Sequence, residues 1–126
     1  MNITIGLQVI PQAGDMKPMR EAWEKADALG VDRLYTADHF HSQVFSSEQV
    51  KAASHSPTGN AKNFEATTIQ AAMAVTTQRA EIGCIVHGNS YRNPNLMADI
   101  ARTIDHLSGG RFILGIGSGY LKEDYD

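Results

Sequence analysis

The first thirty residues combine two hydrophobic periods. Between Ile3 and Val9 every second residue is apolar, which is the period-two pattern of a β-strand. From Lys17 to Leu29 apolar residues recur at helical spacing, and Gly30 follows where a C-capping glycine is expected. This part of the chain therefore predicts one strand followed by one helix.

The remainder of the chain repeats this strand–helix unit around one aperiodic segment. Residues 41–63 show no hydrophobic period and are rich in Ser, Gln, Lys, Asn and Gly, so we expect a long loop. A loop of this length inside a compact domain suits a lid over a binding site. Further strands are predicted at residues 33–36, 80–86 and 111–116, and further helices at 64–77 and 94–108.

The predicted order is β-α-β-α-β-α-β in a single α/β domain spanning residues 1–126. Helices between successive strands give right-handed crossovers and a parallel sheet. Two architectures fit this order, a doubly wound open sheet and part of a (β/α)8 TIM barrel, and the pattern alone does not choose between them. In both, ligands bind beyond the carboxyl ends of the strands.

Polar residues follow the second and third predicted strands directly. Asp38 and His39 come after the second strand, and an imidazole there is suited to hydrogen-bond a cofactor or move a proton. His87, Gly88 and Asn89 come after the third strand, where Gly88 allows close backbone approach. The alternative is that these residues only cap helices and form solvated turns.

The fourth predicted strand runs into a glycine-rich stretch, Gly-Ile-Gly-Ser-Gly, at residues 115–119. Gly117 at its centre would leave room for a flat ligand. A tight turn is the alternative, because this spacing and position do not match the dinucleotide-binding fingerprint.

Composition narrows the class of protein. The formal net charge is -3 and the basic residues are scattered, so we expect no nucleic-acid binding. Cys84 is the only cysteine, which excludes an intrachain disulfide, and no Cys or His spacing suggests a metal site. With no visible signal peptide and no long apolar span, we expect a cytoplasmic protein without membrane association.

Several of these segments together resemble the luciferase-like family of flavin- and F420-dependent oxidoreductases. The resemblance covers nearly the whole chain apart from the long loop. It is carried by residues 29–40 (LGVDRLYTADHF), 77–86 (TQRAEIGCIV), 91–94 (YRNP) and 105–120 (DHLSGGRFILGIGSGY).

The resemblance implies the first half of a (β/α)8 barrel and a redox or monooxygenase activity on a small organic substrate. It implies F420 or FMN as cofactor, and the Tyr-Arg-Asn-Pro string favours F420. His39 matches a histidine near the reactive ring and is the implied catalytic residue. A cis peptide under the ring maps to Cys84–Ile85. The residues implied or expected to bind the cofactor are Asp38, His39, Gly83, Cys84, Ile85, His87, Gly88, Asn89 and Gly117.

The length of 126 residues is about half that of a complete eight-stranded barrel. We therefore expect the catalytic function to belong to a parent protein and the isolated chain to bind cofactor weakly or not at all. The strands at both ends would otherwise be bare edges, so a homo-oligomer or pairing with a second half-barrel is expected. The alternative is a non-catalytic half-barrel that only binds flavin or mediates assembly.

Overall fold

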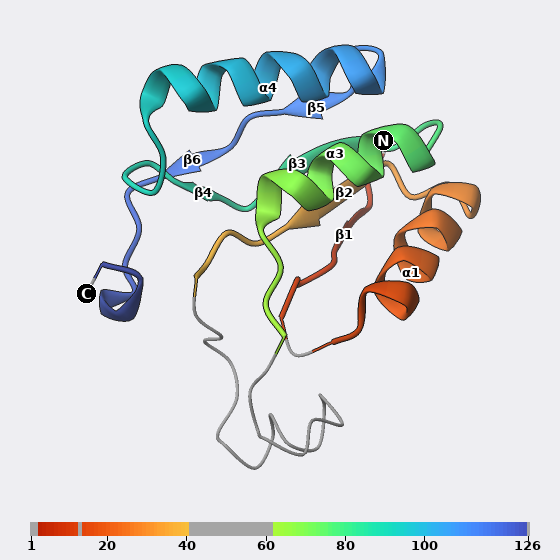
Figure 1. Cartoon of the computed structure of the whole chain (residues 1–126). Helices are drawn as coiled ribbons and strands as arrows, with labels where there is room; N and C mark the ends of the chain where they lie inside the picture. Colours follow the sequence, from red (N-terminus) through yellow and green to blue (C-terminus); the bar gives the residue numbers. More distant parts are fainter. Residues whose placement is uncertain (1–2, 13, 41–61, 126) are drawn as a thin grey trace.

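The computed structural model describes residues 3–12, 14–40 and 62–125 (Figure 1). The predicted lid falls outside the described residues apart from Lys62 and Asn63. Within the described chain, no helix is both long enough and apolar enough to cross a membrane. The elements in chain order are β1 (Gly6–Gln8), α1 (Met16–Ala28), β2 (Arg33–Thr36), α3 (Ala66–Thr76), β3 (Glu81–Cys84), β4 (His87–Gly88), α4 (Pro94–Ser108), β5 (Phe112–Ile113), β6 (Ile116–Gly117) and the 3₁₀ helix η1 (Lys122–Asp124).

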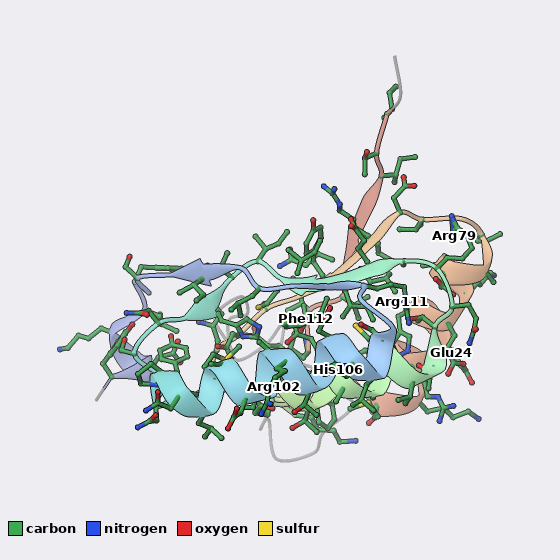
Figure 2. The ribbon with its side chains drawn as sticks, turned by 90° about the horizontal axis from the view of Figure 1, so that it is seen from above. Glu24, Arg79, Arg102, His106, Arg111 and Phe112 are labelled. Carbon is green, nitrogen blue, oxygen red and sulfur yellow. The ribbon has the colours of Figure 1, made fainter. Side chains whose placement is uncertain are left out.

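The strands form a parallel sheet whose spatial order follows the chain. The order is β1-β2-β3-β5, and β4 and β6 form a second parallel pair. Helices α1, α3 and α4 all lie on one side of the strands (Figure 2). A doubly wound sheet reverses its strand order and has helices on both faces. This arrangement is instead that of part of a (β/α)8 barrel.

The hydrophobic core lies between the sheet and the helices. Register places Leu34 of β2 beside Ile82 of β3, and Ile82 beside Phe112 of β5. Leu34 and Ile82 have no accessible surface, and neither have Trp23 of α1 and Met73 of α3, which pack in the same cluster. Burying a side chain of this size contributes about 1.5–3 kcal/mol to folding. The core thus fixes the sheet against the helices and leaves its strand ends to carry polar groups.

The helix ends follow from capping side chains. Asn93 accepts hydrogen bonds from the backbone N–H groups of Asn95 and Leu96, and Pro94 takes the first helical position of α4. Gly109 closes the helix with φ of 70°, a left-handed conformation that favours glycine. Helix α1 begins at Met16, one residue before the predicted start, and β2 has the predicted bounds.

The third and fourth predicted strands are each interrupted. The strand predicted at 80–86 is divided into β3 and β4, and the strand predicted at 111–116 into β5 and β6. The predicted cis bond at Cys84–Ile85 is wrong by one residue, since the cis bond joins Ile85 and Val86. Pairing with β2 extends through Cys84, and the N–H of Ile85 still donates to Thr36 O at 3.0 Å. The regular ladder therefore continues past the predicted position, and the backbone departs from it only afterwards.

Two charged side chains tie together the end of the sheet where the strands begin. Asp27 of α1 accepts hydrogen bonds of 2.7–3.0 Å from three successive backbone N–H groups that precede β3. Arg111, labelled in Figure 2, donates to the carbonyl oxygens of Ala74, Thr77 and Ala80 and to the Thr77 hydroxyl. Both side chains thus saturate backbone groups that helix and sheet leave unpaired.

Candidate functional site

A cavity of about 500 Å³ opens at the other end of the sheet, where the strands finish. The segments after β1 and β2, the β3–β4 connection, and the segment after β6 all contribute to its wall. Its lining residues are Gln8, Ile10, Gln12, Ala37, Asp38, His39, Ile85, Val86, His87, Gly88, Tyr91, Gly117, Ser118, Gly119 and Tyr120.

Ile85 and Val86 give the cavity an apolar surface, with 53% and 42% of their area exposed. Two glycines of the fourth-strand stretch make room for it. A Cβ at Gly115 would lie 2.6 Å from Cys84 O, and a Cβ at Gly117 would lie 2.4 Å from Val86 Cγ2. The approach of the Cys84 backbone therefore requires glycine at 115, and a side chain at 117 would displace Val86.

His87 is a buried imidazole in the cavity wall, with 1% of its surface exposed. Among the described residues neither ring nitrogen has a hydrogen-bond partner, and Nδ1 lies 3.5 Å from Asp38 Oδ2. The ring also borders a second cavity of about 190 Å³ that Asn89 and Arg92 line. Buried polar atoms are rarely left without a hydrogen-bond partner, so we expect a ligand or solvent to supply one to the His87 ring.

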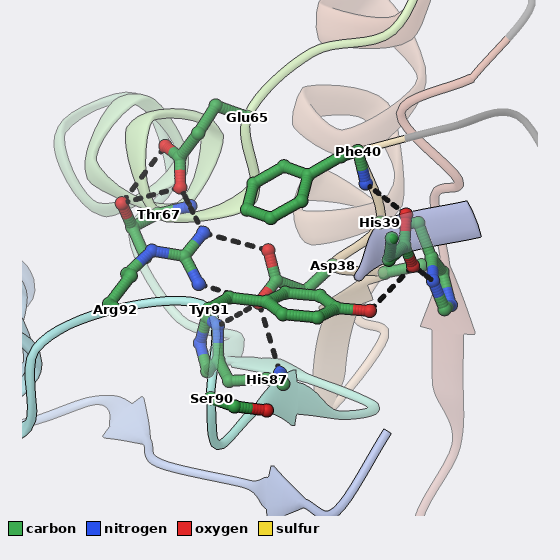
Figure 3. A network of polar contacts seen from close by, with 12 residues as sticks. Asp38, His39, Phe40, Glu65, Thr67, His87, Ser90, Tyr91 and Arg92 are labelled. Carbon is green, nitrogen blue, oxygen red and sulfur yellow. Dashed lines mark hydrogen bonds and ion pairs between the residues drawn. The ribbon is translucent and has the colours of Figure 1, made fainter. Parts of the chain in front are cut away.

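Asp38, Arg92 and Glu65 form a charged network beside His87 (Figure 3). Arg92 donates to both oxygens of Asp38, at 2.6 and 2.7 Å, and also contacts Glu65. Burial opposes ionisation of Asp38, but the hydrogen bonds and charge of Arg92, the nearby His87 ring and the Gly88 N–H together outweigh it and hold the pKa of Asp38 well below its usual range.

Glu65 links this network to helix α3, whose N-terminus it caps. Its carboxylate accepts hydrogen bonds from the backbone N–H groups of Thr67 and Thr68 at 3.1 and 2.7 Å. Burial again opposes ionisation, and the Thr68 and Arg92 contacts overcome it, which lowers the pKa of Glu65 to about 2. The strand end that carries Asp38 and the first turn of α3 are thereby held in one fixed arrangement.

A second carboxylate, that of Asp124 in η1, holds the histidine predicted to be catalytic. His39 Nδ1 lies 2.7 Å from Asp124 Oδ2, and the Tyr91 hydroxyl donates to the same oxygen at 2.5 Å. The rings of Tyr91 and Phe40 lie 4.7 Å apart, and Figure 3 shows these side chains close to His39. Burial and the hydrogen bond to Asp124 raise the pKa of Tyr91.

The structure brings most, but not all, of the predicted site residues to the cavity. Asp38, His39, Ile85, His87, Gly88 and Gly117 line it.

Three predicted residues lie elsewhere. A Cβ at Gly83 would lie 3.1 Å from the Tyr35 ring, which packs over this glycine. Cys84 is 2% exposed, and burial together with the negative charge of Asp38 raises its pKa to about 12. Asn89 borders the smaller cavity. No group of three or more His, Cys, Asp or Glu residues able to hold a metal ion occurs in the described ranges.

The sequence did not identify Gln8, Glu65 or Asp124 as part of the site. Gln8 ends β1 and lines the cavity, and its place at a strand end was the available signal. Asp124 lies 85 residues after its partner His39, in a segment with no hydrophobic period, so no sequence signal marks it.

The fold and the cavity at the carboxyl ends of its strands define an α/β-barrel class of protein. Within that class the chain belongs to the luciferase-like monooxygenase family, whose model matches residues 2–126. The family resemblance found in the sequence is thereby confirmed.

The similar proteins include a monooxygenase and an F420-dependent alcohol dehydrogenase. The chain is 32% identical over 104 residues to 4-hydroxyprotoasukamycin monooxygenase of Streptomyces nodosus subsp. asukaensis, a match covering 82% of this chain and 24% of that protein. A solved F420-dependent secondary alcohol dehydrogenase, in complex with an F420–acetone adduct, superposes with a TM-score of 0.76 at 22% identity, covering 94% of this chain and 32% of the other.

A third similar protein is the FMN-bound oxygenating constituent of 3,6-diketocamphane monooxygenase from Pseudomonas putida. Its TM-score is 0.69 at 20% identity, and the match covers 98% of this chain and 32% of the other. At such identities the two structures support the fold. The chain spans about a quarter to a third of the length of these three proteins.

Proposed function

We propose that the full-length protein is an F420-dependent oxidoreductase that transfers hydride between the cofactor and a small organic substrate. The observation that carries this proposal is the cavity at the strand ends. It combines an apolar surface, Ile85 and Val86, with two imidazoles, His39 and His87. A ligand suited to it has a flat apolar face and polar atoms along its edge, which is the chemistry of a flavin or deazaflavin ring.

The residues of the cavity fit such a ring in three respects. Ile85 and Val86 present exposed apolar surface for one face of the ring. Gly88 and Gly117 leave room for the Tyr91 ring and the Val86 side chain, which both line the cavity. His87 has buried ring nitrogens without hydrogen-bond partners in the described chain, and a polar ring edge would supply one. When bound, the cofactor supplies the redox chemistry, and the protein supplies position and hydrogen bonds.

His39 is the residue we assign to proton movement. Its Nδ1 is engaged by Asp124, so Nε2 is the ring nitrogen left to give a proton to, or take one from, a substrate oxygen. A reaction that interconverts an alcohol and a carbonyl compound needs such a group, which favours F420 over FMN here. The Tyr-Arg-Asn-Pro string at 91–94 and the similarity to an F420-dependent alcohol dehydrogenase support the same choice.

The test is a titration of the full-length protein with F420 and, separately, with FMN, followed by absorbance and fluorescence. We expect a saturable spectral change with F420 only. His39→Gln should retain F420 binding within a few-fold and lose about 10²-fold in kcat, the lower end of the contribution of a positioned acid–base group. His106→Gln is the matched control, because His106 is exposed on α4 outside the cavity and should leave both quantities unchanged.

Each other outcome decides against part of the proposal. A response to FMN alone would overturn the cofactor assignment and favour the oxygen-using branch of the family. Binding of neither cofactor by the full-length protein would overturn the redox function and favour a non-catalytic assembly module.

A further inference from the structure

The Asp124 carboxylate occupies a position with no solvent access, although it belongs to a short helix close to the end of the described chain. Its side chain has 0% exposure, while that of its partner His39 has 16%. The two residues are 85 positions apart in the sequence. η1 therefore lies next to the segment that follows β2, and its carboxylate contacts His39, which lines the cavity.

Three donors fix the orientation of this carboxylate. The backbone N–H of Phe40 donates to Oδ1 at 2.9 Å, and the Tyr91 hydroxyl donates to Oδ2 at 2.5 Å. His39 Nδ1 also contacts Oδ2, at 2.7 Å. Because both oxygens are engaged, rotation of the carboxyl group would break at least one of these bonds.

Contacts of the neighbouring residue Tyr125 also help to hold η1 in place. The Tyr125 ring lies 5.6 Å from the Tyr91 ring, and the Tyr125 hydroxyl donates to Ser118 O at 3.1 Å. Since Tyr125 follows Asp124 directly, these contacts anchor η1 next to the β4–α4 connection. The carboxylate is thus held by neighbours on two different segments of the chain.

We infer that Asp124 is a positioning residue that fixes His39 as the Nδ1–H tautomer. A carboxylate has no hydrogen to donate, so at 2.7 Å the imidazole must be the donor. A neutral ring with hydrogen on Nδ1 carries its lone pair on Nε2. What Nε2 then does rests on the proposed function, but the tautomer itself follows from the contacts alone.

His87 provides an internal contrast for this inference. It lines the same cavity, but its Nδ1 lies 3.5 Å from the Asp38 carboxylate and makes no hydrogen bond within the described chain. Asp38 is already occupied by Arg92, at 2.6 and 2.7 Å. Of the two cavity histidines, His39 therefore has the closer carboxylate contact, 2.7 Å against 3.5 Å for His87.

The test is nitrogen NMR of the full-length protein with ¹⁵N-labelled histidine, without cofactor and at a pH where the imidazole is neutral. His39→Gln identifies the signals of His39. We expect a protonated Nδ1 and an unprotonated Nε2 in the natural protein. Asp124→Asn should shift His39 toward the Nε2–H tautomer, because an amide N–H can donate to Nδ1. Tyr91→Phe removes another donor to the same oxygen and should leave the Nδ1–H tautomer in place.

Activity adds a readout that separates this inference from the proposed function. If F420 binds as proposed, Asp124→Asn should lower kcat about 10²-fold, as loss of a correctly presented acid–base group does, with KM changed only a few-fold. A natural protein with Nε2–H on His39 would overturn the inference even if Asp124→Asn did not fold. An unchanged tautomer in Asp124→Asn would also overturn it. Failure of cofactor binding with the expected tautomer would instead overturn only the proposed function.

Discussion

The two ends of the sheet both carry buried charged side chains, but the partners of those side chains differ. Where the strands begin, Asp27 and Arg111 bind backbone N–H and C=O groups. At the carboxyl ends of the strands, Asp38 binds Arg92 and Asp124 binds His39, so the carboxylates there pair with basic side chains around a cavity in addition to backbone N–H groups. The first arrangement supplies hydrogen-bond partners to backbone groups that would otherwise lack them. The second positions polar side chains around a cavity that can hold a ligand.

This difference indicates that one end of the sheet contributes to stability and the other to ligand binding. Where the strands begin, the hydrogen bonds of Asp27 and Arg111 tie the helices to the strands. At the carboxyl ends of the strands, both ring nitrogens of His87 lack a hydrogen-bond partner among the described residues. Polar groups left unsatisfied next to a cavity indicate binding, whereas saturated ones indicate stability. Substitutions at the two ends should therefore be separable by measuring stability and cofactor affinity together.

The largest expected effect comes from removing one guanidinium at each end. Arg92→Leu leaves the Asp38 carboxylate, 3% exposed, without its main partner. Breaking a buried pair in this way costs about 3–5 kcal/mol. Arg111→Leu removes hydrogen bonds to neutral acceptors only and should cost about 1–3 kcal/mol. Urea unfolding of the full-length protein measures both, and cofactor affinity should fall for Arg92→Leu alone.

A second substitution separates charge from packing in this experiment. Adding Asp38→Asn to Arg92→Leu removes the unpaired charge, so part of the lost stability should return while cofactor affinity stays low. If Arg111→Leu weakened cofactor binding as much as Arg92→Leu, the proposed division between the two ends would be wrong.

A smaller effect is expected from adding one methyl group at each end. Alanine at Gly117 would place Cβ 2.4 Å from Val86 Cγ2 and displace part of the apolar surface of the cavity. We expect a loss of about tenfold in cofactor affinity, or about 1.4 kcal/mol. Gly110→Ala is the control, because Gly110 has φ of 85° with open space around it. Its left-handed backbone should cost about 1 kcal/mol of stability without changing affinity. Equal affinities in a cofactor titration of the two variants would contradict this role of Gly117.

The repeated strand–helix unit could be predicted because it depends on local patterns. The bounds of β2 and of α4 match the prediction, since both are set by residues close in sequence, such as Asn93 and Gly109, which cap α4. The interruption of the later strands could not be predicted from hydrophobic period, and for the third strand only the cis bond implied by the family resemblance indicated an irregular backbone. It arises where Val86 packs against Gly115 and Gly117, a contact between segments about thirty residues apart that no hydrophobic period reveals.

The candidate site was predictable to the extent that strand ends determine it. His39 and His87 follow predicted strands and do line the cavity. Cys84 was included because the cis bond implied by the resemblance maps to Cys84–Ile85, but alternation along β3 places its side chain on the same face as buried Ile82, at 2% exposure. Asp124 was missed because its contact with His39 depends on how the chain turns after β6, which composition and period do not specify.

The smallest effect expected is a difference in acid sensitivity between the two ends. The lowered pKa of Glu65, about 2 against an ordinary 4.5, means that the folded state binds its proton less readily than the unfolded state. Its contribution to stability is present above pH 4.5 and is lost as the pH falls toward about 2. Asp27 behaves in the same direction. Burial raises its pKa, but the backbone hydrogen bonds lower it further, so its contribution is lost below the ordinary value of 3.8.

Glu65→Gln and Asp27→Asn test this difference in acid. Each substitution removes one titrating group, so each should flatten the fall in the free energy of unfolding over its own pH window. Because Glu65 is 41% exposed and solvent screens its charge, the flattening there should be modest. Only Glu65→Gln should also change how cofactor affinity depends on pH, since Glu65 contacts Arg92 at the cavity end. Urea unfolding at a series of pH values, with a cofactor titration at each, measures both. An equal effect of Asp27→Asn on affinity would mean that the two ends are coupled through the sheet and do not act separately.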